Sequence, residues 1–195
     1  MKDRVIYSWM FKTDSVNNFA WWNNFLTKEE CKNIIEDNKT KIKKGRISNK
    51  LVINEKIRDS YTYFISPEKE YQWLFRRLTD VIIQLNERYF NFDVTGLIEG
   101  LQFTHYKGKG NYYGKHLDSM YGGVIRKLSV SIQLSDPKKY KGGDLILHTG
   151  NKGDIMRKDQ GTLFIFPSYT LHEVTPVTKG ERNSLVCWVN GPSFK

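Results

Sequence analysis

Cysteine is scarce in this chain of 195 residues, which contains only Cys31 and Cys187, far apart in the sequence. Two distant cysteines exclude a disulfide-rich secreted scaffold and fit a reducing compartment. The sequence has no run that approaches the roughly 18 apolar residues needed to span a bilayer. Residues 1–16 also lack the continuous apolar stretch of a signal peptide. We therefore expect a cytoplasmic protein with no membrane span.

Acidic residues are outnumbered, since 21 Asp and Glu stand against 31 Lys and Arg, which gives a formal net charge of +10. A basic balance favours anionic partners and carries no information about the fold. The densest cluster is KTKIKKGRISNK, residues 39–50. A solvated lysine-rich loop explains this cluster, and an acidic polypeptide or nucleic acid stays open as a partner. No nucleic-acid-binding motif supports the second, and nothing in the sequence indicates an oligomeric state.

Two helices are predicted in the first half of the chain. Thr27 and Glu30 have the spacing of a capping box, which predicts a helix starting at residue 28. A second helix is predicted from Pro67, a residue type favoured in the first helical turn. Apolar residues then recur at three- and four-residue steps between Tyr71 and Tyr89. Such a stripe packs against a flat partner, such as a sheet.

Beyond about residue 96 the pattern changes to short strands, predicted at residues 101–106, 128–134, 144–147, 162–166 and 183–189. The stretch LSVSIQL alternates strictly, with apolar residues on one face and Ser129, Ser131 and Gln133 on the other. Helices followed by strands predict an α+β, mainly β fold with a sandwich or barrel. The length favours one domain, 1–195, with a helical supporting part at 1–95 and a strand-rich core at 96–195.

Histidine is also scarce, and of the four only His116 has a carboxylate two residues later, Asp118. Residues two apart in an extended segment point the same way, so this pair could bind one cation. Taken alone, it fits a surface pair better. His172 begins another predicted strand and is the candidate third ligand. Two histidines and one carboxylate form the facial triad of non-haem Fe(II) oxygenases.

Arg182 gives this iron hypothesis a second element. Non-haem iron needs electrons, commonly from 2-oxoglutarate, whose far carboxylate requires a fixed cation. The planar guanidinium of arginine binds a carboxylate through two hydrogen bonds. Ser184 lies two residues further and shares the face of Arg182. Alone, Arg182 also fits a surface turn residue.

The combination of His116-x-Asp118, His172 and Arg182-x-Ser184 resembles the 2-oxoglutarate/Fe(II)-dependent dioxygenase superfamily. Within it, the frame of Tyr106 followed by Tyr113-x-x-His116 resembles the prolyl hydroxylase-like branch, which includes the PKHD-type hydroxylases. The resemblance covers roughly residues 96–190.

This resemblance implies a double-stranded β-helix, a jelly-roll barrel, braced by N-terminal helices. It implies that Tyr106 lies beside 2-oxoglutarate and that Tyr113 lines the substrate entrance. A tyrosine that helps to hold the cosubstrate in some prolyl hydroxylases corresponds to a position near Ile132 here. Since the apolar alternation turns Ile132 inward, Arg182 and Ser184 are expected to carry more of the anchoring.

The implied activity is hydroxylation of an unactivated C–H bond, most simply of a peptidyl residue such as proline, with release of succinate and CO2. The implied cofactors are Fe(II), 2-oxoglutarate and O2, with ascorbate as a further candidate. The same chemistry on a nucleobase or a free small molecule remains an alternative, as does a non-catalytic jelly-roll binding module. The complete set of candidate ligands argues against the last.

Overall fold

The computed structural model describes residues 15–45, 56–121 and 123–194. The basic cluster at 39–50 is described only as far as Gly45, and its remainder lies outside the described residues. Residues 1–14, on which the absence of a signal peptide was mainly argued, also lie outside them. Within the described ranges, no helix is long and apolar enough to cross a membrane.

The described chain forms two α-helices, one 3-10 turn and three antiparallel sheets. The helical elements are α1 (Lys28–Asn38), α2 (Gln72–Tyr89) and η1 (Pro137–Lys139). The large sheet runs in the order β1 (Ala20–Trp22), β12 (Leu163–Pro167), β8 (Val124–Gln133), β15 (Glu181–Asn190), β5 (Leu101–Lys107), β4 (Tyr61–Ile65) and β2 (Lys43–Lys44), with β7 (Met120–Tyr121) paired to β8. The small sheet runs β11 (Asp154–Ile155), β10 (Leu145–Leu147), β13 (His172–Val174), β6 (Tyr112–His116) and β3 (Arg58–Asp59), and β14 (Val177–Lys179) pairs with β9 (Lys141–Gly142).

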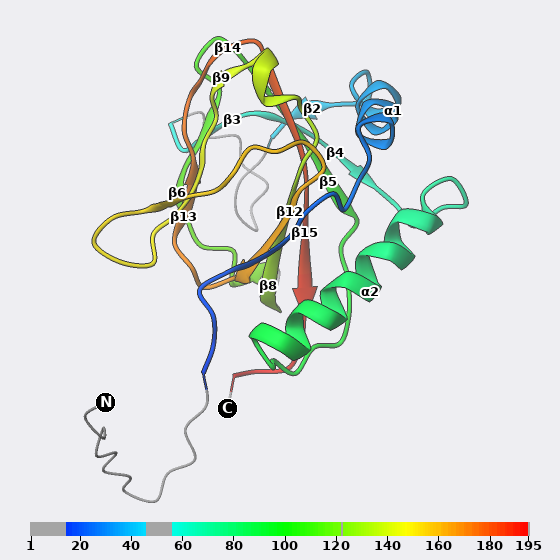
Figure 1. Ribbon diagram of the computed structural model, residues 1–195, viewed down its shortest axis with the longest axis vertical. Coiled ribbons are helices and arrows are strands. Elements are labelled where there is room, and N and C mark those ends of the chain that lie inside the picture. The colour runs from blue at the N-terminus through cyan, green and yellow to red at the C-terminus, as the bar shows by residue number, and fades with distance from the viewer. Residues whose placement is uncertain (1–14, 46–55, 122, 195) are drawn as a thin grey trace, which may run out of the picture.

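The helices and the small sheet lie on opposite sides of the large sheet (Figure 1). In this view α1 and α2 lie on the right, and β6 and β13 lie on the left. Two facing antiparallel sheets make the double-stranded β-helix that the sequence predicted, mainly β and braced by helices. The interior between the sheets is therefore available for a site.

Helix α1 begins where the sequence predicted. The Thr27 hydroxyl accepts a hydrogen bond from the Glu30 amide at 3.1 Å, and the Glu30 carboxylate accepts one from the Thr27 amide at 2.9 Å. Both partners of the capping box are therefore present, and they satisfy amides that the first helical turn leaves free.

Helix α2 begins five residues later than predicted, at Gln72 rather than at Pro67. Pro67 lies in a bend, and the amides of Tyr71 and Gln72 both donate to the Glu68 carbonyl before the helix proper starts. The apolar stripe is confirmed. Its residues Leu74, Leu78, Val81, Ile82 and Leu85 are buried in one core with apolar residues of the large sheet.

Both faces of β8 are buried, for different reasons. Leu128, Val130 and Ile132 pack in the core that α2 covers. Ser129, Ser131 and Gln133 face the interior between the two sheets. Alternation in the sequence thus marks two buried environments, one apolar and one polar.

The N-terminal part contributes more than helices. It supplies β1, β2 and β4 to the large sheet and β3 to the small one. These strands are two to five residues long, too short for a period-two pattern to be recognised. Its assignment to a single domain with residues 96–195 stays a prediction.

Candidate metal centre

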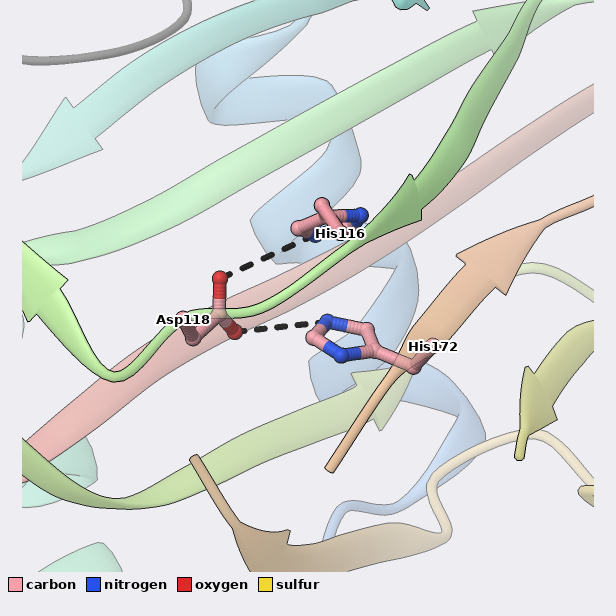
Figure 2. Close-up of side chains that lie close together, drawn as sticks. All are labelled: His116, Asp118 and His172. Atoms are coloured by element: carbon pink, nitrogen blue, oxygen red, sulfur yellow. Dashed lines mark ion pairs between the residues drawn. The ribbon is translucent and has the colours of Figure 1, made fainter. Parts of the chain in front are cut away.

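The small sheet brings His116, Asp118 and His172 together (Figure 2). His116 is the last residue of β6, His172 is the first of β13, and the two are paired across these antiparallel strands. His116 Nε2 lies 3.7 Å from Asp118 Oδ1, and His172 Nε2 lies 3.3 Å from Asp118 Oδ2. One ligand atom from each residue lies within 4.8 Å of the others. The three side chains therefore form the 2-His-1-carboxylate triad.

Backbone carbonyls fix the orientation of both imidazoles. His116 Nδ1 is 2.7 Å from the Gly114 carbonyl, and His172 Nδ1 is 2.9 Å from the Thr170 carbonyl. A carbonyl only accepts, so each Nδ1 carries the proton. Nε2 is therefore the nitrogen that each ring presents toward Asp118, which is the arrangement of a metal ligand.

Asp118 is held by the large sheet and by the turn after β12. Its Oδ2 accepts a hydrogen bond from the Ser129 hydroxyl at 2.9 Å, and its amide donates to the Ser168 carbonyl at 3.0 Å. The carboxylate is buried. Its orientation is thus determined before any ligand arrives.

The electrostatics of the triad fit a cation. Burial and the neighbouring His172 lower the pKa of His116 to about 4. Burial opposes ionisation of Asp118, but His172 and His116 hold the pKa of its carboxyl well below the usual range. Burial opposes a charge on His172, and Asp118 outweighs it, so the pKa of His172 is raised. Two imidazole nitrogens and one carboxylate oxygen, facing one point, suit Fe(II).

The other two histidines do not contribute to this centre. The buried His105 donates from Nδ1 to the Asn183 side chain at 2.8 Å. His148 lies 2.9 Å from the Glu173 carboxylate. The triad is the one group of three or more potential metal ligands found among the described residues.

A cavity of about 780 Å³ opens from the triad between the sheets. Its lining includes the other residues singled out by the sequence, Arg182, Ser184, Tyr106 and Tyr113. Arg182 and Ser184 lie on β15, Tyr106 on β5 and Tyr113 on β6. The fold therefore gathers all seven candidate residues around one space.

Arg182 is a buried cation, 1% exposed. Its guanidinium donates to Ser184 Oγ at 3.3 Å and to Gln133 Oε1 at 3.2 Å. No carboxylate of the described residues pairs with it. A buried guanidinium without a counter-charge is costly, so this end of the cavity fits an anion such as the far carboxylate of 2-oxoglutarate.

Ile132 is turned inward, as the apolar alternation predicted, and the larger anchoring role of Arg182 and Ser184 stays a prediction. Ile132 packs in the core under α2, away from the cavity, and its neighbour Gln133 contacts Arg182 instead. Sequence reasoning also missed Ser129, which orients Asp118. Both belong to the polar face of LSVSIQL, so the signal was present as polar residues inside a strand buried on both sides.

Aromatic rings flank the metal ligands. The Tyr113 ring stacks on His116, with centroids 3.5 Å apart and planes 13° from parallel, and the Arg58 guanidinium lies 4.6 Å from the Tyr113 centroid. Burial raises the pKa of Tyr113 to about 12, so it stays a neutral phenol. Tyr106 is 3% exposed, and Arg182 lies 5.3 Å from its ring centroid.

A further group at the cavity was also missed. Arg126 donates to both oxygens of Glu99, at 2.7 and 2.5 Å, and its guanidinium lies 3.7 Å from the Trp188 ring centroid. All three residues line the cavity. Nothing in the sequence pairs Glu99 with Arg126, because their contact depends on the packing of β8 beside the chain leading into β5.

Comparison with known families matches residues 101–190 to the model of the 2OG-Fe(II) oxygenase superfamily. This range contains the whole triad. The resemblance predicted from the motifs is thereby confirmed.

Several relatives of known sequence are PKHD-type hydroxylases. One from Prochlorococcus marinus is 39% identical over 100 residues, which cover 51% of this chain and 45% of the relative. Another, from Nitrosomonas europaea, is 33% identical over 121 residues, covering 58% of this chain and 52% of the relative. The chain thus spans about half the length of these relatives.

Solved structures of prolyl hydroxylases share the superfamily fold seen here. A Trichoplax adhaerens prolyl hydroxylase, in complex with a peptide fragment of the hypoxia inducible factor oxygen degradation domain, aligns with a TM-score of 0.77 and 23% identity over 90% of this chain and 84% of that one. A Pseudomonas putida prolyl-4-hydroxylase aligns with a TM-score of 0.72 and 19% identity over 90% and 94%. At these identities the likeness establishes the fold.

Proposed function

We propose that this protein is a 2-oxoglutarate- and Fe(II)-dependent hydroxylase that acts on a peptidyl residue, with proline as the first residue to test. One observation carries the proposal: a single cavity holds the converging triad at one place and the buried, carboxylate-free Arg182 at another. A metal ligand set alone fits many proteins, but a separate buried cation in the same cavity calls for an anionic cosubstrate.

His116, Asp118 and His172 would hold the iron through Nε2, a carboxylate oxygen and Nε2. Bound Fe(II) together with 2-oxoglutarate supplies the oxidising chemistry that inserts one atom of O2 into a C–H bond, with succinate and CO2 as co-products. The chain provides orientation. Ser129 fixes Asp118, and the carbonyls of Gly114 and Thr170 fix the two rings.

Arg182 would clamp the far carboxylate of 2-oxoglutarate. Its planar fork stays charged when buried and suits two parallel hydrogen bonds. Ser184 and Gln133 already bond to the guanidinium, and so they would hold it in position. Tyr106, with its ring beside Arg182, would line the cosubstrate.

Tyr113 would line the substrate entrance, since it covers one face of His116 at the cavity wall. A peptidyl substrate is supported by the fold shared with prolyl hydroxylases. One of those was solved with a bound peptide.

The test is turnover in the presence of Fe(II), O2, 2-oxoglutarate and a peptide library that contains proline. We expect succinate, and peptides that gain the mass of one oxygen atom. His116→Ala should abolish both products, whereas His148→Ala, which changes a histidine outside the triad, should retain them. Succinate without any modified peptide would move the proposal to the nucleobase or small-molecule alternative. Succinate formation at the same rate with and without added Fe(II) would contradict the proposed function.

A further inference from the structure

The cavity extends beyond the triad and Arg182, over the outer strands of the large sheet. This second part, here called the outer groove, is lined by Lys41, Lys43, Thr62, Phe64, Gln102 and Thr104. Phe64 is 48% exposed, so the groove is open to solvent at that end. Neither the metal nor the cosubstrate needs this space.

Strand register shows how the outer groove joins the site. Lys43 pairs with Thr62, Thr62 with Thr104, and Thr104 with Ser184. Directly paired residues present their side chains on the same face. Lys43 therefore shares a face with the Arg182–Ser184 region at a distance of three strand spacings, or about 14 Å. An extended peptide spans that distance with about four residues.

Among the described residues, two cations of the cavity wall are paired with carboxylates, whereas Arg182 at the cosubstrate end and the lysines of the outer groove are not. Arg126 is paired with Glu99 at 2.5 Å, and Lys44 with Asp59 at 2.5 Å. Within the described part of the chain, Lys41 and Lys43 have no carboxylate partner. Lys41 lies 5.5 Å from the Tyr63 ring centroid, a contact that leaves its charge uncompensated. An unbalanced positive end on a groove that leads to the triad fits an anionic ligand.

Resting on the hydroxylase function proposed above, we propose that the outer groove binds an extended acidic segment of the peptide substrate. Carboxylates of that segment pair with Lys41 and Lys43, while the residue to be hydroxylated lies at the triad, about four or more residues away. Between them, the Gln102 amide nitrogen donates to the Thr104 hydroxyl at 3.0 Å. The Thr62 hydroxyl and the Gln102 side-chain oxygen are left to bond a peptide backbone.

A peptide fits this groove better than a nucleic acid. A nucleic-acid strand carries a phosphate at every nucleotide, and the middle of the groove, formed by Thr62, Gln102 and Thr104, offers no cation for them. Positive charge is instead concentrated at one end. A short run of acidic side chains at one distance from the target residue matches that distribution.

The probe is a fluorescein-labelled peptide that carries one proline and a run of glutamates about four residues from it, tested with the run on either side. Its partner has glutamine in place of glutamate. A single-stranded oligonucleotide of equal charge is the third probe. Binding is followed by fluorescence anisotropy, with the protein loaded anaerobically with Fe(II) and 2-oxoglutarate, so that no turnover is required.

Two double variants of equal net charge separate the groove from bulk electrostatics. Lys41→Glu/Lys43→Glu reverses the charge at the end of the outer groove. Lys28→Glu/Lys152→Glu reverses two exposed lysines that do not line it. We expect the groove variant to bind the glutamate peptide about tenfold or more weakly at low salt. Its affinity for the glutamine peptide should change little. The control variant should bind like the unaltered protein.

Equal weakening by both double variants would overturn the proposal, because the effect would then be one of net charge. Tighter binding of the oligonucleotide than of the glutamate peptide would replace it with a nucleic-acid groove. If the protein binds Fe(II) and 2-oxoglutarate but neither glutamate peptide, the groove proposal fails and the hydroxylase function stands. If Fe(II) does not bind, the hydroxylase function itself fails.

Discussion

Arg182 combines full burial with the absence of a carboxylate partner among the described residues, which makes it the residue most informative about the cosubstrate. Arg182→Ala should lower the affinity for 2-oxoglutarate by roughly two orders of magnitude, because two charged hydrogen bonds contribute about 1.5–3 kcal/mol each. Arg182→Lys should recover part of this loss, since an ammonium lacks the planar fork. Ser184→Ala should cost least. Titration of 2-oxoglutarate and of Fe(II) measures each variant.

Iron affinity is the internal control of that series, and it should remain close to that of the unaltered protein. If the Arg182→Ala protein binds 2-oxoglutarate as the unaltered protein does, the cosubstrate lies elsewhere.

Gly143 supports Arg182 through its backbone. Its φ is +64°, and an added Cβ would lie 2.8 Å from Arg182 Cδ and 2.8 Å from Val177 Cγ2. Gly143→Ala should therefore displace the Arg182 guanidinium. The affinity for 2-oxoglutarate should fall roughly tenfold or more, since small displacements in a site strongly reduce its efficiency. Gly150→Ala is the matched control, because nothing lies within 4 Å of a Cβ there and its φ is not left-handed. Identical affinities in both variants would show that Arg182 tolerates the displacement.

At the scale of elements, α2 stabilises the sheet that carries half of the site. Leu78 is fully buried between this helix and the large sheet. Leu78→Ala should reduce the free energy of unfolding by about 2–5 kcal/mol. Ile83 lies on the same helix with its side chain 45% exposed, so Ile83→Ala should reduce the free energy of unfolding by under about 1 kcal/mol. Urea unfolding measures both, and equal losses would contradict the packing described for α2.

Elements with a long repeating pattern were predictable from the sequence, and short ones were not. The α2 stripe and the alternation in β8 run over many residues, so their periods are clear. Strands β2 and β3 are two residues long and form only because β4 and β6 offer them partners. The start of α2 was misplaced because the bend at Pro67 depends on how the chain leaves β4.

At the scale of the whole molecule, the fold explains which parts of the site were predictable. His116 and Asp118 were predictable as ligands from their spacing of two residues, and His172 was predictable because it begins a strand. Gln133 and Ser129 were missed because their role depends on which face of β8 looks toward the small sheet. The apolar face of β8 lies under α2, so its polar face looks toward the small sheet. The alternation in LSVSIQL marks the two faces but does not show that the polar face lines a site.

The central claim is that His116, Asp118 and His172 form one Fe(II) site, and anaerobic calorimetric titration with Fe(II) tests it most directly. We expect one equivalent of iron per chain in the unaltered protein and in His148→Ala, whose histidine pairs with Glu173 outside the triad. Asp118→Ala should lose at least about a hundredfold in affinity, since even changes behind the ligands cost about 10–100-fold. Binding of iron by Asp118→Ala with the affinity of the unaltered protein would contradict the account.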